Sequence, residues 1–235
     1  IFGIALLIIA ALGLAIIFGM MGVINLAHGA FILVGAYSAV TVTNAGLSFW
    51  FAFVVAPVVV GVIGLITERL VIHRLYDRPI DTLLATWGIA LVIQEVVRIV
   101  FGTSSQSVAN PLSVPLSALG TSFSTYRIFL TALAAGLVGV TYVIFKFTDF
   151  GTKSRAVIQN DKMAGALGTN VDRIYSITFV IGAMLAGIAG AAIAPIVAVD
   201  PNAGIGYLVQ SFIAVIVGGT GQIIAGAVGG ASVVS

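Results

Sequence analysis

Charged residues are scarce in this 235-residue chain, and cysteine is absent. Only 8% of the residues are Asp, Glu, Lys or Arg, and none of these occurs between Ile1 and Thr67. The absence of cysteine excludes disulfides and every metal or redox site that requires a thiolate. Because so long an uncharged, mainly apolar stretch cannot be buried in a soluble domain, it indicates about three membrane spans of roughly 20 residues each.

Seven hydrophobic segments predict an all-α fold, a polytopic bundle of transmembrane helices. They cover residues 1–22, 30–45, 50–66, 82–101, 128–147, 174–194 and 207–231. These segments are continuous apolar runs, whereas the strands of a membrane β-barrel alternate apolar and polar residues. We expect a single transmembrane domain over residues 1–235, with about seven spans here and eight or more in the full chain.

One segment, residues 30–45, is shorter than a full span. Asn25 and His28 interrupt the apolar sequence before it, and such breaks free backbone groups that protein or a water-lined cavity must satisfy. A half-helix or re-entrant piece that lines a substrate path is therefore one interpretation. The other interpretation is a plain helix–helix turn at the cytoplasmic surface.

Basic residues concentrate in two of the connecting loops. They are Arg69, Arg74 and Arg78 in residues 67–81, and Lys146, Lys153, Arg155, Lys162 and Arg173 in residues 146–173. Seven alternating spans place both loops on one face, and the positive-inside rule predicts that this face is cytoplasmic in a plasma (inner) membrane. Residues 102–127 then form an external loop, whose polar, turn-rich sequence suits contact with an external partner. Because the net charge of +2 resides in short loops rather than in a patch, it does not indicate nucleic-acid binding.

The longer basic loop contains the pattern of a short helix over residues 161–167. Two residues can cap its start, Asn160 or Asp161. Gly168 can end it in the left-handed conformation. Met163 and Leu167 share one face at i, i+4 spacing, and an exposed apolar face on so short a helix cannot stabilise itself. One interpretation is that this face docks into a groove of another protein; the other is that it rests on lipid or on its own bundle.

Lys162-Met163-Ala164, followed after three residues by Gly168, resembles the E-A-A-x-x-x-G coupling segment of ABC importer permeases. Lys162 stands in the Glu position of that motif, and Met163 stands in its first Ala position. In those permeases the segment docks into a cleft of the ATP-binding subunit. The resemblance therefore implies that ATPase coupling involves Asp161, Lys162, Met163, Ala164, Leu167 and Gly168.

Longer stretches resemble the branched-chain amino acid permease family. GMMGVINLAHGAFILVGAY (residues 19–37) resembles its N-terminal motif, and residues 179–191 and 210–230 resemble later segments in the same order. Residues 78–102, which contain LLATWG, look most like the urea branch of that family. The resemblance implies a homologous second permease subunit, two ATP-binding subunits and an external solute-binding protein. It also implies that ATP and Mg²⁺ bind to the partner subunits and that this chain has no cofactor of its own.

These expectations give a main function and two alternatives. The main expectation is a permease subunit of an ATP-driven importer that moves urea, or a short amide, by alternating access. A branched-chain amino acid permease is the alternative in the same class, because helix ends can hold the charged groups of a zwitterion. An ATP-independent small-solute channel is the alternative from another class, but it would not need a long loop with a coupling helix. An enzyme is not expected, since the chain has two histidines, no cysteine and no H-E-x-x-H metal motif.

Polar residues in the membrane segments predict the lining of the substrate path. They are Asn25, His28, Thr86, Trp87, Gln94 and Glu95. An ionisable group costs roughly 2.5–3.5 kcal/mol at the bilayer centre, so it indicates a functional site by default. For Glu95 the alternative is an ion pair with Arg98 at i, i+3 spacing near the outer interface. For Trp87 the alternative is an anchor at the membrane surface.

Small residues repeat at every fourth position in the segment at residues 174–194. Gly182, Ala186 and Gly190 form one series, and Ala183, Gly187 and Ala191 form the second. Small residues let helix backbones approach closely in membranes, so we expect both series to pack against neighbouring helices. The sequence Gly218-Gly219-Thr220-Gly221 predicts a break in the last hydrophobic segment.

Overall fold

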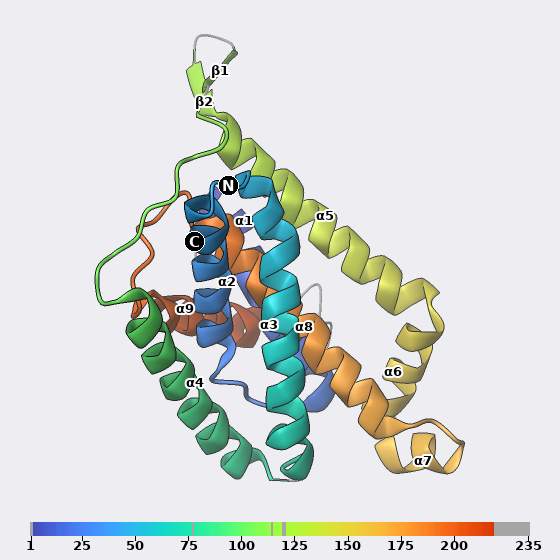
Figure 1. The fold of residues 1–235 in the computed structure, drawn as a ribbon. Helices are drawn as coiled ribbons and strands as arrows, with labels where there is room; N and C mark the ends of the chain where they lie inside the picture. Colours follow the sequence, from blue (N-terminus) through green and yellow to red (C-terminus); the bar gives the residue numbers. More distant parts are fainter. Residues whose placement is uncertain (1, 77, 114, 119–120, 219–235) are drawn as a thin grey trace.

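The structure, a computed structural model, describes residues 2–76, 78–113, 115–118 and 121–218 of the chain (Figure 1). Its elements are α1 (Phe2–Met21), α2 (His28–Asn44), the 3-10 helix η1 (Phe49–Phe51), α3 (Ala52–Leu70), the 3-10 helix η2 (Ile72–Arg74), α4 (Pro79–Phe101), β1 (Pro115–Ala118), β2 (Thr121–Ser124), α5 (Thr125–Phe147), α6 (Asp149–Gln159), α7 (Asp161–Ala166), α8 (Val171–Ile193) and α9 (Ala203–Gly218). Apart from one short hairpin, the described elements are helices, which confirms the predicted all-α class.

Five helical segments are long and apolar enough to cross a membrane. They are Gly3–Met21, Phe49–Arg74, Pro79–Phe101, Thr125–Phe147 and Val171–Ile193. Helix α2 has 17 residues and is therefore about 26 Å long, less than the roughly 30 Å of a hydrocarbon core. The described part of α9 has 16 residues and ends at Gly218, the first residue of the predicted break. Residues 219–221 of that break and the rest of the last hydrophobic segment lie outside the described residues. The polytopic helical bundle is confirmed, with five segments of spanning length in the described part of the chain, beside the shorter helices α2 and α9.

Helix α4 shows why helix starts extend beyond the hydrophobic segments. It begins at Pro79, three residues before the apolar run, and Asp81 lies in its first turn. Proline has the φ angle of a helical first turn and lacks only an N–H that would be unpaired there. A carboxylate in the first turn is stabilised by the positive end of the helix dipole.

Helix α8 packs against α1, α2 and α3. Its small residues allow this close packing, and Ala183, Ala186 and Ala189 are fully buried. A β-carbon added at Gly187 would lie 2.8 Å from the Ala56 carbonyl oxygen of α3, which is closer than ordinary van der Waals contact. The predicted packing role of the small-residue series is therefore confirmed.

The loop between α4 and α5 contains structure that the sequence analysis did not predict. Strands β1 and β2 form an antiparallel hairpin in which Pro115 pairs with Ser124. Before this hairpin, Gln106 exchanges two backbone hydrogen bonds of 2.8 Å with Val199. The second pairing joins the two long connections that follow α4 and α8.

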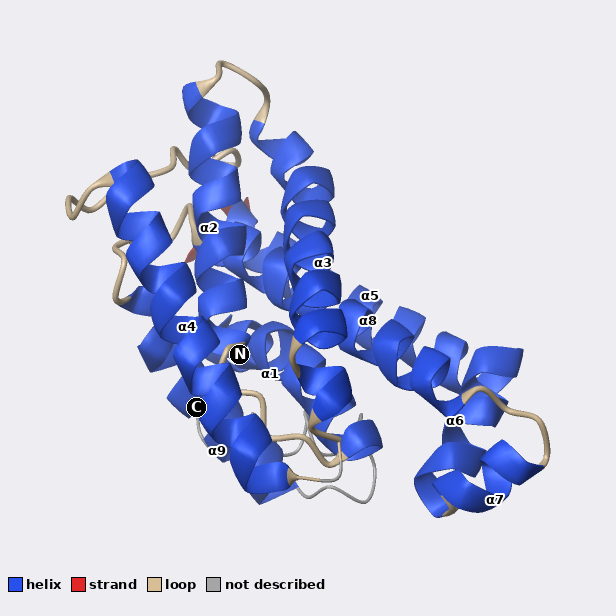
Figure 2. Cartoon of the chain, turned by 60° about the horizontal axis from the view of Figure 1, so that its bottom comes forward, coloured by secondary structure: helices blue, strands red, loops and turns tan. Residues whose placement is uncertain are grey.

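Both basic loops lie at one end of the bundle, the lower end in Figure 1. We call this the basic end; it comprises residues 71–76 and 78, between α3 and α4, and residues 148–170, which contain α6 and α7. The α2–α3 connection lies at the opposite end (Figure 1). Figure 2 shows that α6 and α7 stand out from the bundle beyond α5 and α8. If both loops are cytoplasmic, they must lie on the same side of the membrane, and their shared location agrees with this prediction.

Candidate functional site

Residues 22–27 connect α1 to α2 without helical structure, and we call them the α1–α2 break. The side chain of Asn25 is fully buried there, and its Oδ1 accepts a hydrogen bond of 3.0 Å from Ala27 N. Leu26 N donates to Oγ1 of Thr86 on α4 at 3.1 Å, and Thr86 is also fully buried. Protein side chains thus satisfy backbone groups that have no water available at membrane depth.

His28, the first residue of α2, is fully buried against α1. Its Nε2 donates a hydrogen bond of 2.8 Å to the Ala10 carbonyl oxygen. Because Ala10 lies near the middle of α1, helix α2 begins about half-way along α1 rather than at its end. This geometry agrees with the half-helix interpretation of the segment, and it places the α1–α2 break inside the bundle.

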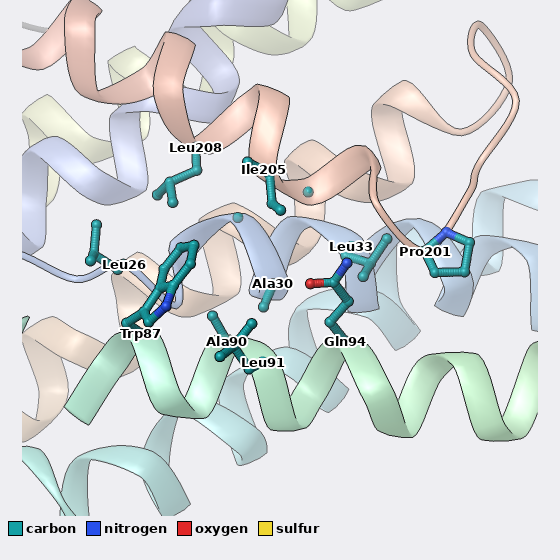
Figure 3. Close-up of a pocket in the computed structure, with 12 residues that line it drawn as sticks. Leu26, Ala30, Leu33, Trp87, Ala90, Leu91, Gln94, Pro201, Ile205 and Leu208 are labelled. Carbon is teal, nitrogen blue, oxygen red and sulfur yellow. The ribbon is translucent and has the colours of Figure 1, made fainter. Parts of the chain in front are cut away.

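A small pocket lies between α2, α4 and α9 (Figure 3). Seven of its twelve lining residues have aliphatic side chains: Leu26, Ala30, Leu33, Ala90, Leu91, Ile205 and Leu208. Two predicted path residues, Trp87 and Gln94, project from α4 toward α2 in Figure 3. The pocket has a volume of about 20 Å³, which is room for one water molecule and too little for an organic solute. In this structure the pocket is therefore closed to an organic solute.

Gln94 and Glu95 are neighbours in sequence but bind different groups. Gln94 Nε2 donates to Oδ1 of Asn202 at 2.8 Å, and Arg98 Nη2 donates to the same oxygen at 2.7 Å. Arg98 Nη1 lies 3.1 Å from Oε2 of Glu95, whose side chain is 59% exposed. The structure thus contains the Glu95–Arg98 ion pair of the alternative interpretation, and Glu95 does not line the pocket.

Helix α7 occupies the position of the predicted coupling helix at the basic end. Asn160 Oδ1 accepts a hydrogen bond of 2.9 Å from Met163 N and so caps its start. Gly168 has a φ of +88°, and Thr169 N donates to the Ala164 carbonyl oxygen at 3.0 Å. This left-handed residue and hydrogen bond are those of a Schellman motif, which satisfies carbonyl groups at a helix end. Both predicted end signals are therefore confirmed.

One face of α7 is apolar and exposed. Met163 is 59% exposed and Leu167 is 81% exposed. Leu167 follows the last helical residue, Ala166, so the helix is one residue shorter than predicted. Ala164, by contrast, is buried in a cluster that includes Val157 of α6. The helix is therefore fixed to its own chain by one face and presents the other face outward.

The two remaining predicted coupling residues form the first turn of α7. Asp161 Oδ1 accepts a hydrogen bond of 2.7 Å from Lys162 N. Beyond α7, Asn170 Oδ1 accepts a hydrogen bond of 2.9 Å from Arg173 N and caps the start of α8. Only residues 167–170 separate the two helices, so the predicted coupling helix lies next to the start of α8 in the chain.

The whole chain matches one protein family, described as "Branched-chain amino acid transport system / permease component", over residues 1–235. The chain belongs to this family. The permease is 27% identical to the high-affinity branched-chain amino acid transport system permease protein LivH of Salmonella typhimurium, over 94% of this chain and 77% of the relative. It is 28% identical to the corresponding protein BraD of Pseudomonas aeruginosa with the same coverage. It is 29% identical to the probable LivH of Methanocaldococcus jannaschii, over 96% of this chain and 74% of the relative. No solved structure matches the chain.

Family membership makes the chain a permease subunit of an ABC transporter in the inner membrane, with ATP-binding and solute-binding partners. The predicted urea branch is not supported. The family description and the names of these relatives refer to branched-chain amino acids, so the amino acid alternative fits better than the main expectation.

The permease contains a buried polar cluster around Glu68 that the sequence did not predict. Glu68, on the last turn of α3, is fully buried. Its Oε2 accepts a hydrogen bond of 2.5 Å from Ser176 Oγ on α8, and its Oε1 accepts one from the Tyr76 hydroxyl. Burial and the Glu68 carboxylate raise the pKa of Tyr76 above its ordinary value, so the phenol remains a hydrogen-bond donor. One feature of the sequence could have indicated this site: Glu68 is the first charged residue after the long apolar run.

Proposed function

We propose that this chain is a membrane-spanning subunit of an ATP-driven importer for branched-chain amino acids. The observation that carries the proposal is the family match over residues 1–235. Relatives that align with 94% or more of the chain are named for the same substrates, which supports the choice over urea. The assembly would contain a homologous second permease subunit or a second copy, two ATP-binding subunits with ATP and Mg²⁺, and an external solute-binding protein.

The lining of the pocket between α2, α4 and α9 supports an aliphatic substrate. Leu33 and Leu91 face Ile205 across a space that also contains the ring of Trp87 (Figure 3). Burial of a branched aliphatic side chain against such a lining is favourable, at about 0.8 kcal/mol per methylene. Urea has no apolar part and gains nothing from these contacts.

The first turns of α2 and α9 offer a place for the substrate carboxylate. These turns meet beside the pocket, where a β-carbon added at Gly204 would lie 2.6 Å from the Gly29 carbonyl oxygen. Helix N-termini carry partial positive charge, and discontinuous membrane helices use such ends to hold anionic substrate groups. In this proposal the carboxylate therefore lies at the two helix starts and the aliphatic side chain lies along α4.

Transport requires the closed pocket to widen, because its volume of about 20 Å³ does not admit an amino acid. The source of this movement in the proposal is α7, whose exposed Met163 and Leu167 dock into the ATP-binding subunit. Closure of the two ATP-binding subunits displaces α7, and the bundle alternates between inward-open and outward-open states. The permease itself performs no covalent chemistry.

Uptake of radiolabelled leucine and radiolabelled urea tests the proposal. Both are measured in vesicles that contain this chain with its partner subunits, with and without ATP, and vesicles that lack the ATP-binding subunits serve as the control. ATP-dependent leucine uptake that excess urea does not inhibit is the expected result. ATP-dependent uptake of urea, without uptake of leucine, would instead identify urea as the substrate. Solute flux of the same rate with and without ATP would favour a channel.

A further inference from the structure

The Glu68 carboxylate joins three elements at the basic end. It belongs to α3, Ser176 belongs to α8, and Tyr76 belongs to the connection between α3 and α4. Each carboxylate oxygen accepts one hydrogen bond, Oε2 from Ser176 at 2.5 Å and Oε1 from Tyr76. An ionised carboxylate only accepts hydrogen bonds, so it suits a position between two hydroxyl donors that approach from different elements.

Stability alone is a poor reason for a buried charge at this position. Glu68 is fully buried, and the nearest basic group, His73 Nδ1, lies 3.9 Å from its Oε1 with a side chain that is 44% exposed. Within the part of the chain that the structure describes, neither Lys nor Arg pairs with Glu68. Desolvation of a carboxylate costs several kcal/mol, and well-packed apolar residues often stabilise a fold as much as a buried ion pair does. The carboxylate is therefore a candidate for a role in switching between arrangements.

On one side, the cluster is linked to α7 through the first turns of α8. Ser176 lies in the second turn of α8, and α8 begins only a few residues after α7 ends. The ring of Tyr175 on the same turn lies 4.9 Å from the ring of Tyr76. A shift of the start of α8 therefore reaches both hydrogen-bond partners of Glu68.

On the other side, the cluster is connected to the α1–α2 break. Thr82 Oγ1 on α4 donates to the carbonyl oxygen of Leu75, the neighbour of Tyr76, at 2.8 Å. One turn further along α4, Thr86 Oγ1 accepts the hydrogen bond of 3.1 Å from Leu26 N. A continuous series of hydrogen bonds and rigid helices thus runs from α8 through Glu68 and α4 to residues 22–27.

We propose that Glu68 is a positioning residue that transmits the displacement of α7 and α8, through Tyr76, to α4 and the α1–α2 break. This inference rests on the proposed function, because it concerns how ATP-driven movement at α7 reaches the substrate path. The competing explanation is that Glu68 only clamps α3 to α8. A clamp affects stability, whereas a transmitting residue changes the amount of solute moved for each ATP hydrolysed.

The test uses the complete transporter in proteoliposomes and measures leucine uptake and ATP hydrolysis in the same vesicles. Ser176→Ala and Tyr76→Phe each remove one hydroxyl and one hydrogen bond to Glu68. Each variant should lower the ratio of uptake to ATP hydrolysis by at least about fivefold, the lower end of typical coupling between sites. Ser176→Thr keeps the hydroxyl and should restore the ratio. Ser211→Ala is the matched control, because Ser211 is a fully buried serine on α9 whose hydroxyl has no partner among the described residues.

The outcomes separate the two explanations. An unchanged ratio in folded Ser176→Ala and Tyr76→Phe would overturn the transmitting role and leave the proposed function intact. A lower melting temperature with uptake and hydrolysis reduced in proportion would show a clamp, and it would also overturn the inference. Absence of ATP-driven leucine uptake by the unaltered transporter would overturn the proposed function itself, and this inference with it.

Discussion

Replacement of both exposed apolar residues of α7 tests its docking role most directly. The change is the double substitution Met163→Asp and Leu167→Asp. Met163 is 59% exposed and Leu167 is 81% exposed, so neither fills the interior of the bundle. Exposed substitutions of this kind usually change the free energy of unfolding by less than about 0.5 kcal/mol. The isolated permease should therefore keep its melting temperature.

The double substitution should weaken binding to the ATP-binding subunit much more than it lowers the stability of the permease. Full burial of a leucine or methionine side chain contributes about 1.5–3 kcal/mol. The portions of Met163 and Leu167 that are still exposed would therefore contribute about 1.5 kcal/mol each on docking. Their joint loss of about 3 kcal/mol weakens association with the ATP-binding subunit about 100-fold, before any cost of burying the new carboxylates.

The assay is co-purification with the ATP-binding subunits, followed by ATP-driven leucine uptake in vesicles. The control is Lys153→Asp on α6, which makes the net charge more negative by the same two units on an exposed residue of the same protruding region. The double variant should lose both binding and uptake, and the control should keep both. Normal ATP-driven uptake by the folded double variant would refute the docking argument.

Three further substitutions test the packing and the caps. Gly187→Val should destabilise the bundle by about 1–3 kcal/mol in detergent unfolding because its side chain meets the backbone of α3, whereas Gly136→Ala, where an added β-carbon meets no atom within 4 Å, should not. Thr86→Val leaves Leu26 N–H without its acceptor and should cost about 1–3 kcal/mol in the same measurement, while Thr86→Ser should retain stability. Asn160→Ala removes the cap of α7 and about 1 kcal/mol of helix stability, so hydrogen exchange in α7 should accelerate about fivefold.

Hydropathy predicted the long apolar helices but not the polar helix α6. Each of the seven apolar segments overlaps a described helix. Helix α6 was not predicted, because its sequence contains a glycine and three charged residues and lacks an apolar run. In the structure Thr148 caps it through a hydrogen bond of 3.2 Å from Gly151 N, and Val157 is buried. Tertiary packing thus stabilises a helix that local hydropathy does not reveal.

Site residues were predictable where their partners are close in sequence. The Asn160 cap, the left-handed Gly168 and the Glu95–Arg98 pair all follow from spacings of a few residues, and the structure contains each of them. Glu68 and Ser176 are 108 residues apart, so no local pattern indicates their hydrogen bond. Only the packing of α8 against α3 shows that this carboxylate is buried.

Helix α4 connects the α1–α2 break to the buried cluster of Glu68, Tyr76 and Ser176. Because α2 starts half-way along α1, its preceding backbone depends on Thr86 of α4 for a hydrogen bond. The connection that leads into α4 depends in turn on Glu68, through Tyr76. The same helix contributes Trp87 and Gln94 to the closed pocket, and most of its surface is exposed in this chain. A shift of α4 would therefore alter the α1–α2 break, the connection that contains Tyr76 and the pocket wall together. We therefore expect that opening of the pocket and the response to α7 occur as one movement of α4.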